Sequence, residues 1–428
     1  MNSLKQNRRP IGIDLFSGAG GLSLGFEQAG FNIIAAVEID PIHCAVHKYN
    51  FPNSTTICAS VAELSGKEIR QRSKIGNKEI DCVFGGAPCQ GFSMIGKRVL
   101  EDPRNQLVFH YVRLVGELRP KYCVFENVKG LTIGNHKKFL HELIEALNCA
   151  GYNVLLPYQV LNAADYGVPQ DRRRLFLIGT RKDEKLPVYP KPASRVSVID
   201  AIGDLPDVDC FDELLLNDSI SIRFETKSQY ANRLRGFAID PDDLSYPRNF
   251  NPHVLSSSLR TEHTELSRKR FTETKHGKTE SISRFYKLHP DGLCNTLRAG
   301  TDSARGAFTS PRPIHPFYPR VITVREAARL HSYPDWFRFH VTKWHGFRQI
   351  GNSVPPLLGR AIAKQIVQAL GLTPLKPKIK LIPGQGSDEL LTFDMSSAAK
   401  HFSVPTTVIA PRSRKITQKI NEKEVIGV

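Results

Sequence analysis

The chain lacks the cysteine pattern of metal sites and disulfide frameworks. Its eight cysteines are scattered over 428 residues, and none forms a Cys-x-x-Cys pair. This spacing argues against a structural zinc site or a disulfide scaffold and favours a reducing compartment. We therefore expect no bound metal and a cytoplasmic location.

Long apolar runs and a balance of charge are also missing. No stretch approaches the roughly 18 apolar residues that a membrane helix needs. The first ten residues, MNSLKQNRRP, are basic without the apolar segment of a secretory signal. Lys and Arg number 59 against 42 Asp and Glu, a net charge of +17, so we expect a soluble protein with a polyanionic partner such as nucleic acid.

Strand-like and helix-like patterns alternate from residue 11 to residue 180. Short apolar runs predict strands at 11–16, 33–38, 82–84, 122–126 and 175–178. Apolar residues at helical spacing predict helices at 22–29, 105–118, 136–150 and 359–370. This alternation predicts an α/β fold with a doubly wound, mixed but mostly parallel sheet.

The regular alternation ends near residue 185, where prolines become frequent. The length fits two domains. We expect a catalytic and cofactor-binding domain at 1–184 and a second, smaller domain of irregular or β-rich character at 185–338. A return segment at 339–371 would complete the first domain, and 372–428 would be a C-terminal extension or linker.

The segment GGAPCQGFS, residues 85–93, follows one of the predicted strands. It places the thiol of Cys89 on a tight loop at the carboxyl edge of the sheet, where ligands bind in open α/β folds. A buried free cysteine is the commoner role of a lone cysteine. The position at the sheet edge makes Cys89 a candidate nucleophile.

A glycine-rich turn follows the first predicted strand. Gly18, Gly20 and Gly21 lie between this strand and a helix, and Glu38 ends the next strand, where an acid can bind ribose hydroxyls. A tight turn alone could explain the glycines. Their spacing fails the dinucleotide fingerprint, because Gly21 follows Gly20 directly. S-adenosylmethionine therefore fits better than a nicotinamide cofactor, and a nicotinamide oxidoreductase is disfavoured.

Charged residues gather near two other strands. Glu126 follows three apolar residues at a strand end, where burial raises the pKa of a carboxyl group. Arg172 and Arg174 alternate at the entry of a buried strand, so both could point into the cleft. A capping glutamate and a solvated basic run are the simpler interpretations. The motif QIGNSVPP, residues 349–356, adds amide and hydroxyl groups before the last helix.

In order, the motifs DLFSGAGG, VEID, GGAPCQGFS, ENV, QDRRR, RVITVREAARLHSYPD and QIGNSVPP resemble those of the DNA (cytosine-5)-methyltransferases. The resemblance covers about residues 11–184 and 295–371. It implies a Rossmann-like, class I S-adenosylmethionine-dependent methyltransferase fold. The unmatched residues 185–290 coincide with the family's target-recognition region, so the predicted domain at 185–338 would be a target-recognition domain.

The resemblance implies a mechanism for methylating carbon 5 of a cytosine that is flipped out of double-stranded DNA. Cys89 would add to carbon 6 of the ring, and Glu126 would hold or protonate nitrogen 3. Arg174, and with it Arg172, would contact the base and phosphate. The cofactor pocket would be formed by Phe16, Gly18, Gly20, Leu22, Glu38, Ile39, Ser60, Val61, Asn352, Ser353 and Val354.

Ser60 departs from the family pattern, which commonly has an aspartate there to bind the adenine amino group. A serine hydroxyl accepts a weaker hydrogen bond, so we expect looser cofactor binding that leans on the Val61 amide. The candidate DNA contacts are Gln90, Ser93, Arg233, Arg235, Arg268, Arg270 and Arg298.

Two alternatives within the same family stay open. A transfer-RNA cytosine-5 methyltransferase would share the chemistry, but the long 185–290 segment favours DNA. A catalytically silent DNA-binding relative would have lost Cys89, Glu126 or Arg174, all of which are present. We expect a monomeric bacterial modification enzyme, paired in function with a restriction endonuclease that acts on the same site.

Overall fold

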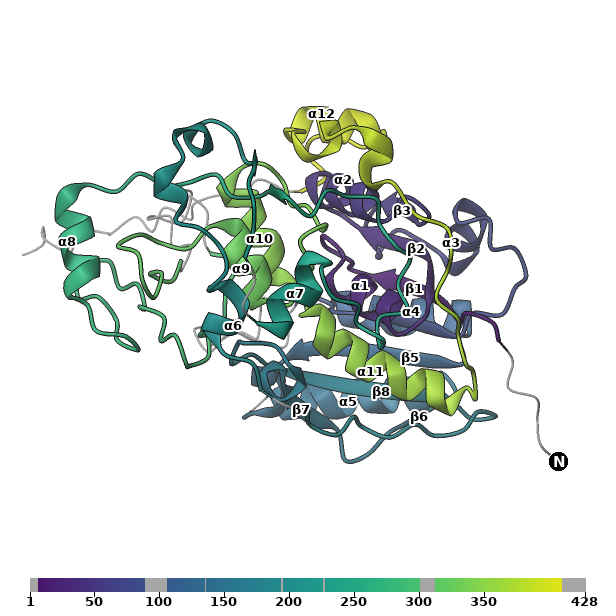
Figure 1. Cartoon of the computed structure of the whole chain (residues 1–428). Helices are drawn as coiled ribbons and strands as arrows, with labels where there is room; N and C mark the ends of the chain where they lie inside the picture. The colour runs from purple at the N-terminus through teal and green to yellow at the C-terminus, as the bar shows by residue number, and fades with distance from the viewer. Residues whose placement is uncertain are drawn as a thin grey trace, which may run out of the picture.

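The computed structural model describes residues 7–88, 106–134, 136–193, 195–225, 228–300 and 312–409. Within these residues, one eight-stranded sheet has the order β3-β2-β1-β4-β5-β8-β6, and β7 pairs with β8. Helices cover both faces of this sheet, and a second group of helices and loops lies beside it (Figure 1). The predicted α/β fold with a doubly wound, mostly parallel sheet is confirmed.

The strands form where short apolar runs end in polar or glycine residues. β1 to β5 are parallel, whereas β8 runs antiparallel to β5 and pairs with β6 and β7. The bounds are β1 Ile11–Leu15, β2 Asn32–Glu38, β3 Thr55–Cys58, β4 Cys82–Gly85, β5 Tyr122–Val128, β6 Tyr152–Val154, β7 Gln159–Asn162 and β8 Arg173–Arg181. All five predicted strands are present, and β3, β6 and β7 are additional.

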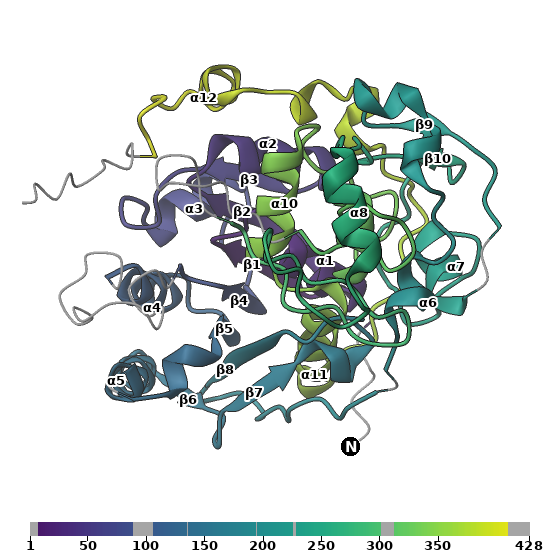
Figure 2. The ribbon, with the colours of Figure 1, turned by 90° about the vertical axis from the view of Figure 1, so that its left-hand side faces the viewer.

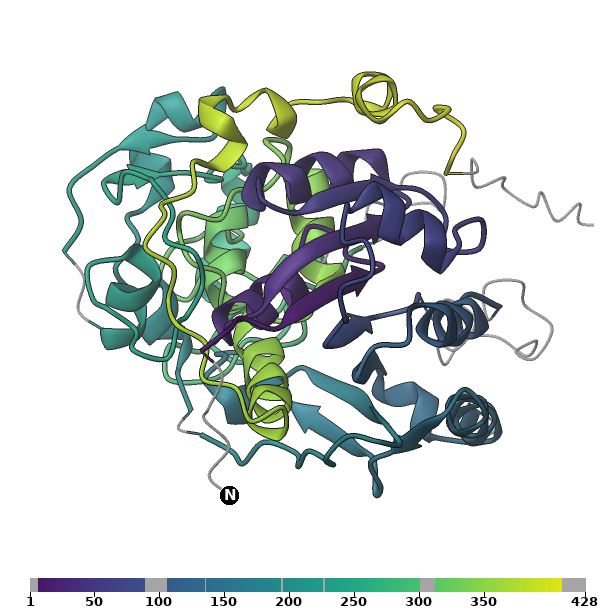
Figure 3. The same cartoon turned by 90° about the vertical axis from the view of Figure 1, so that its right-hand side faces the viewer.

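Two helical layers sandwich the sheet (Figures 2 and 3). α3, α4 and α5 lie on one side, and α1 and α11 lie on the other. The bounds are α1 Gly21–Gln28, α2 Pro41–Asn50, α3 Gly66–Arg72, α4 Gln106–Leu118, α5 His136–Cys149 and α11 Pro356–Ala369. The four predicted helices are confirmed as α1, α4, α5 and α11.

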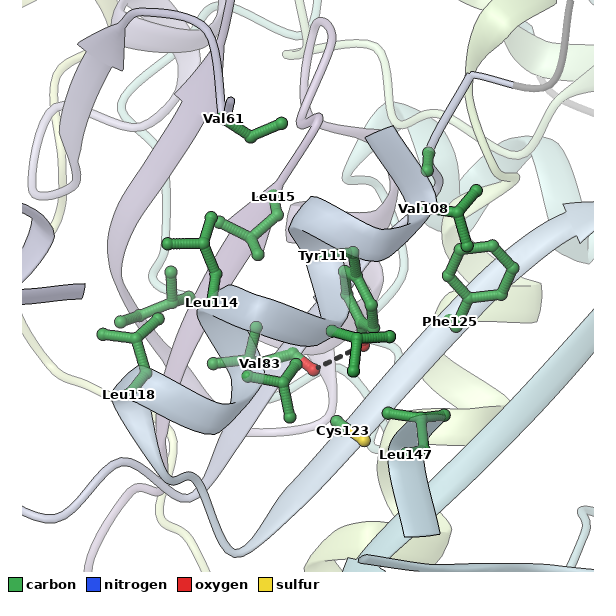
Figure 4. Close-up of a cluster of buried hydrophobic side chains, with 14 of the residues drawn as sticks. Leu15, Val61, Val83, Val108, Tyr111, Leu114, Leu118, Cys123, Phe125 and Leu147 are labelled. Atoms are coloured by element: carbon green, nitrogen blue, oxygen red, sulfur yellow. Dashed lines mark hydrogen bonds between the residues drawn. The ribbon is translucent and has the colours of Figure 1, made fainter. Parts of the chain in front are cut away.

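The largest apolar cluster lies between the sheet and α4 and α5 (Figure 4). Tyr111 of α4 packs on the face of β4 and β5, and its hydroxyl donates to the Val83 carbonyl at 3.3 Å. Its ring meets the Phe125 ring edge-on, with centroids 5.4 Å apart. Burying these side chains fixes the parallel strands against the helical layer, so their carboxyl ends are held at one edge.

The region between β8 and α11 is mostly short helices and loops. Its strands, β9 and β10, have two residues each, so the region is irregular rather than β-rich among the described residues. A buried ion-pair cluster stabilises it: Asp335 accepts from Arg329 Nε at 2.6 Å, and Arg235 Nε lies 2.7 Å from the same carboxylate. The bounds are α6 Val198–Ile202, β9 Ile220–Ser221, α7 Gln229–Arg235, β10 Val254–Leu255, α8 Glu265–Glu273, α9 Val324–Leu330 and α10 Lys343–Asn352.

Short 3₁₀ helices and one further α-helix complete the described chain. The last three elements lie beyond α11 and pack against the sheet domain, where α12 lies over α2 (Figure 1). The bounds are η2 Lys129–Thr132, η3 Ala163–Tyr166, η4 Val208–Cys210, η5 Asp212–Leu215, η7 Pro383–Gly386, η8 Glu389–Leu391 and α12 Met395–Phe402. In the described part of the chain, no helix has both the length and the apolar character of a membrane span.

Candidate active site

A cavity of about 480 Å³ opens at the carboxyl ends of all five parallel strands; we call it the strand-end cavity. Residues that end or follow β1 to β5 line one side, and residues of α10 and the turn before α11 line the other. The edge is therefore built from segments more than 300 residues apart in the sequence. This is the place where open α/β sheets bind their ligands.

Ten of the eleven predicted cofactor residues line the strand-end cavity. They are Phe16, Gly18, Leu22, Glu38, Ile39, Ser60, Val61, Asn352, Ser353 and Val354. Gly20 is not among the lining residues. It has a φ of 104° as the N-cap of α1, and a side chain there would collide with the Phe51 ring. Gly20 therefore shapes the turn instead of lining the cavity.

The Glu38 carboxylate holds the glycine turn in place. It accepts the backbone N–H of Gly18 at 2.8 Å, of Ile39 at 3.0 Å and of Asp40 at 2.9 Å. A carboxylate has about four lone-pair positions, so it can accept a further hydrogen bond. The predicted acid thus stabilises the end of β2 and the turn after β1, and it also faces the cavity.

Ser60 lies in the cavity wall in the position that the family pattern gives to aspartate. Its hydroxyl oxygen accepts the Ala62 N–H at 3.2 Å, in a local turn. The serine is therefore partly engaged by its own backbone. The looser cofactor binding that this predicts stays a prediction.

Three buried polar atoms on the cavity wall have no hydrogen-bond partner among the described residues. They are Ser17 Oγ, His43 Nε2 and Gln349 Nε2. A buried polar group without a partner is costly, and native proteins satisfy such groups with protein, water or ligand atoms. The lining therefore fits a ligand that has several hydrogen-bonding atoms and an apolar body.

Asp14, which is not among the predicted site residues, is buried in the floor of the cavity. Its carboxyl accepts the Ser23 hydroxyl at 2.6 Å, and Ser23 Oγ lies 3.2 Å from His47 Nε2. Burial raises the pKa of Asp14 to about 8. A charged residue in the apolar strand before the glycine turn was the sequence signal that could have identified it.

Glu126 lies at the end of β5, buried and facing the cavity. Arg174 Nε lies 3.0 Å from its Oε1. A side chain on Gly86 would come within 2.5 Å of its Oε2, so this glycine leaves room for the carboxyl group. Burial raises the pKa of Glu126 and outweighs the attraction of Arg174 and Arg172, in agreement with the direction expected from its position.

The predicted nucleophile Cys89, together with Gln90 and Ser93, lies outside the described residues. The last described residue before it, Pro88, lines the strand-end cavity. Asn127 ties the same loop to β5, because its side-chain amide donates to the Ala87 carbonyl at 3.2 Å. The loop that carries Cys89 therefore starts from the cavity, beside Glu126.

Arg172 differs from the expected arrangement, in which both arginines point together into the cleft. Its guanidinium is buried and donates to the carbonyls of Leu297, Gly351 and Ser353, each at 2.8 Å. Arg174 alone pairs with Glu126. Arg172 thus fastens the turn before α11, whose residues line the cavity, to the entry of β8.

Gln170 and His331, which were not predicted as site residues, support the same turn. Gln170 Nε2 lies 3.0 Å from His331 Nδ1, and His331 Nε2 lies 3.1 Å from the Ser353 carbonyl oxygen. Burial lowers the pKa of His331, so the ring is neutral and donates from Nε2 while Nδ1 accepts from the amide. Both residues stand in quoted motifs, but only the fold shows their pairing.

The predicted DNA contacts fall into two groups. Arg233 and Arg298 are exposed. Arg235 is buried against Asp335, and Arg268 lies 2.7 Å from Asp209, while Arg270 Nη2 donates to the Ser267 hydroxyl at 3.2 Å. We therefore leave Arg235 out of the DNA surface proposed below, because its guanidinium is already paired inside the protein.

Comparison with known proteins agrees with this site. Residues 12–368 match the model of the C-5 cytosine-specific DNA methylase family. The type II methyltransferase M.XorII of Xanthomonas oryzae pv. oryzae is 62% identical over 408 residues, which cover 95% of this chain and 96% of that protein. M1.HphI of Haemophilus parahaemolyticus is 35% identical and covers 83% of this chain and 86% of its own length.

A solved structure is similar to most of this chain. It is described as a prophage-encoded DNA modification methyltransferase from E. coli, with 36% identity and a TM-score of 0.71. The match covers 84% of this chain and 99% of the other. The similarity therefore extends over most of the chain.

Proposed function

Since the chain belongs to the C-5 cytosine-specific DNA methylase family, and is a DNA (cytosine-5-)-methyltransferase of the restriction–modification kind, we propose how its site acts. S-adenosylmethionine would bind in the strand-end cavity, and Cys89 would attack a cytosine flipped out of the duplex. The observation that carries this proposal is the shared cavity. Ten of the eleven predicted cofactor residues line it, together with Glu126 and Pro88.

The cofactor proposal rests on the donor set of the cavity. Glu38 would bind the ribose hydroxyls, and Asn352 and Ser353 would bind polar atoms of the amino acid portion. The unpartnered atoms of Ser17, His43 and Gln349 add capacity for further hydrogen bonds. When bound, S-adenosylmethionine supplies an electrophilic methyl group.

The protein residues would then prepare the base. The Cys89 thiolate adds to carbon 6 of cytosine, while Glu126 in its protonated form donates a hydrogen bond to nitrogen 3. This addition places electron density on carbon 5, which takes the methyl group. Loss of the carbon 5 proton and release of the thiolate regenerate Cys89. The raised pKa of Glu126 supports its protonated form, and Arg174 holds the carboxyl group in position.

The finer biological setting is also a proposal. Residues 185–338 would read the DNA sequence, with exposed Arg233 and Arg298 among the phosphate or base contacts. The enzyme would act as a cytoplasmic monomer, and a restriction endonuclease would share its site without needing to bind it. Sequencing methylated cytosines in DNA from cells that express the chain identifies the target and tests for sequence specificity.

The test of the mechanism is a pair of cysteine variants. Cys89→Ser should abolish transfer of a tritiated methyl group to DNA and leave cofactor binding nearly unchanged, because the thiol attacks the base and not the cofactor. Cys149→Ser is the matched control, since Cys149 is an exposed free cysteine at the end of α5. It should keep wild-type turnover. If Cys89→Ser retained a tenth of wild-type turnover, the nucleophile assignment would be wrong.

A further inference from the structure

We propose that the C-terminal extension, through Val408 and Ile409, forms part of the cofactor-binding wall of the strand-end cavity. Both side chains line this cavity together with Phe16, Glu38 and Asn352. The family match ends at residue 368, so none of the motifs assigns a role to this segment. The inference rests on the proposed function for the identity of the ligand, a nucleoside cofactor.

The extension is first fastened along the side of the sheet domain. After α11 the Leu375 carbonyl accepts from Arg9 Nη1 at 3.1 Å. The Leu381 N–H then donates to the Pro247 carbonyl, and the Leu381 carbonyl accepts the Asn249 N–H, both at 2.8 Å. The chain therefore follows a defined path from the end of α11 toward α2 (Figure 3).

A second set of contacts fixes the extension over α2. The Tyr49 hydroxyl donates to Asp388 at 2.7 Å, and Lys48 Nζ lies 2.9 Å from His401 Nε2. Leu391, Ala398 and Ala399 are buried in this packing. Since α2 begins directly after Glu38 and Ile39, the extension is held beside one wall of the cavity.

Two further hydrogen bonds connect the extension to the opposite wall. The Leu391 carbonyl accepts the Val341 N–H at 3.1 Å, and the Phe393 carbonyl lies 3.0 Å from His340 Nε2. These partners immediately precede α10, whose last residues line the cavity. The extension thus bridges the two halves of the site before Val408 and Ile409 reach it.

The chemistry of this contribution is apolar. Val408 and Ile409 are half-buried, and the Val408 N–H donates to the Pro405 carbonyl at 3.0 Å, which closes a turn. They join Ile39, Val61 and Leu107 in the lining. Apolar side chains of this kind favour the planar base of a nucleoside, which gains from removal of its faces from water.

The experiment replaces both side chains in the full chain and measures cofactor binding directly. Val408→Ser combined with Ile409→Ser should weaken binding of S-adenosylmethionine, measured by isothermal titration calorimetry, about tenfold. The thermal midpoint without cofactor should stay at the wild-type value. The matched control is Thr406→Ala combined with Thr407→Ala in the same segment, at exposed positions outside the lining, which should bind as wild type does.

The outcomes separate this inference from the proposed function. If the wild-type chain binds the cofactor and the Val408/Ile409 double variant binds it equally well, the extension has no part in the site while the proposed function stands. Tighter binding by the double variant would mean that these side chains obstruct the cavity, and would also overturn the inference. If the wild-type chain does not bind S-adenosylmethionine at all, the proposed cofactor is wrong, and the inference falls with it.

Discussion

Arg172→Met tests whether the first arginine of the QDRRR motif is a structural clamp. The substitution keeps an apolar stem but removes three hydrogen bonds of 2.8 Å to the carbonyls of Leu297, Gly351 and Ser353. Hydrogen bonds from a charged donor contribute about 1.5–3 kcal/mol each, and carbonyls left buried without a partner add a cost. The structure around the three carbonyls relaxes, and the contributions of the individual hydrogen bonds are not additive. We therefore expect the free energy of unfolding to fall by about 3–5 kcal/mol in total.

The assay is urea unfolding followed by tryptophan fluorescence. With a slope of about 3 kcal/mol per molar urea, the expected loss lowers the unfolding midpoint by about 1–2 M. Trp336 and Trp344 are suitable reporters, because both lie in the segment between α9 and the end of α10 that leads to the clamped turn. Cofactor affinity should fall as well, since Ser353 lines the strand-end cavity.

The neighbouring arginine provides the control. Arg173 has a side chain that is 56% exposed, and its carboxylate partner Asp171 lies 3.5 Å away. Arg173→Met should therefore change stability by no more than about 0.5 kcal/mol. Equal unfolding midpoints for the two variants would refute the clamp, and direct contact of Arg172 with DNA would become the better explanation of the motif.

Three further predictions concern backbone approach, protonation and charge. Gly21→Ala should destabilise the protein by about 1–3 kcal/mol and weaken cofactor binding, because the new methyl group would come within 2.5 Å of the Val354 carbonyl oxygen. Gly116→Ala is the control, because nothing lies within 4 Å of the new methyl group, and it should stabilise α4 by about 0.5–1 kcal/mol. Equal shifts of the thermal midpoint for the two variants would contradict the close packing at Gly21. For Asp14, a folded-state pKa of about 8 lies above the ordinary value of 3.8, so between these pH values the folded protein binds a proton that the unfolded chain has lost. Wild-type stability should therefore fall relative to Asp14→Asn as the pH rises from about 4 to 8; a difference in urea midpoint that is constant across this range would count against the raised pKa. DNA affinity should decrease with salt with a logarithmic slope of about −5 for roughly six phosphate contacts, and a slope near zero would mean that the net charge of +17 lies away from the DNA.

The sheet and most of the cavity lining could be predicted because they depend on local patterns. Apolar runs ending in glycine or acidic residues located β1, β2, β4 and β5, and parallel strands necessarily bring such ends to one edge. Glu38 and Glu126 were found in this way. The turn at Ser353 was included in the predicted cofactor pocket only because its motif resembles that of the family. Nothing in its local sequence indicates that the chain returns here to the first strand.

What could not be predicted depends on partners far away in the chain. Arg235 was expected on the surface, but Asp335, a hundred residues later, pairs with it in the interior. The alternation of Arg172 and Arg174 indicated a shared face and could not show that one would bind carbonyls and the other Glu126. Such choices are made by tertiary packing and leave no local signal.

The position of α11 has a consequence for the order in which the protein folds. It packs on α1 so closely that a side chain on Gly25 would come within 2.5 Å of the Pro356 carbonyl oxygen. During synthesis α1 emerges more than 300 residues before α11, so the apolar surface they share is uncovered for most of translation. The nascent first domain therefore cannot bury this apolar surface until the return segment leaves the ribosome. Until then it is prone to aggregation or chaperone binding. A chain truncated before residue 339 lacks α11, and residues 339–428 supplied as a separate polypeptide would cover the exposed apolar surface. Co-expression of this polypeptide should therefore raise the soluble yield of the truncated chain.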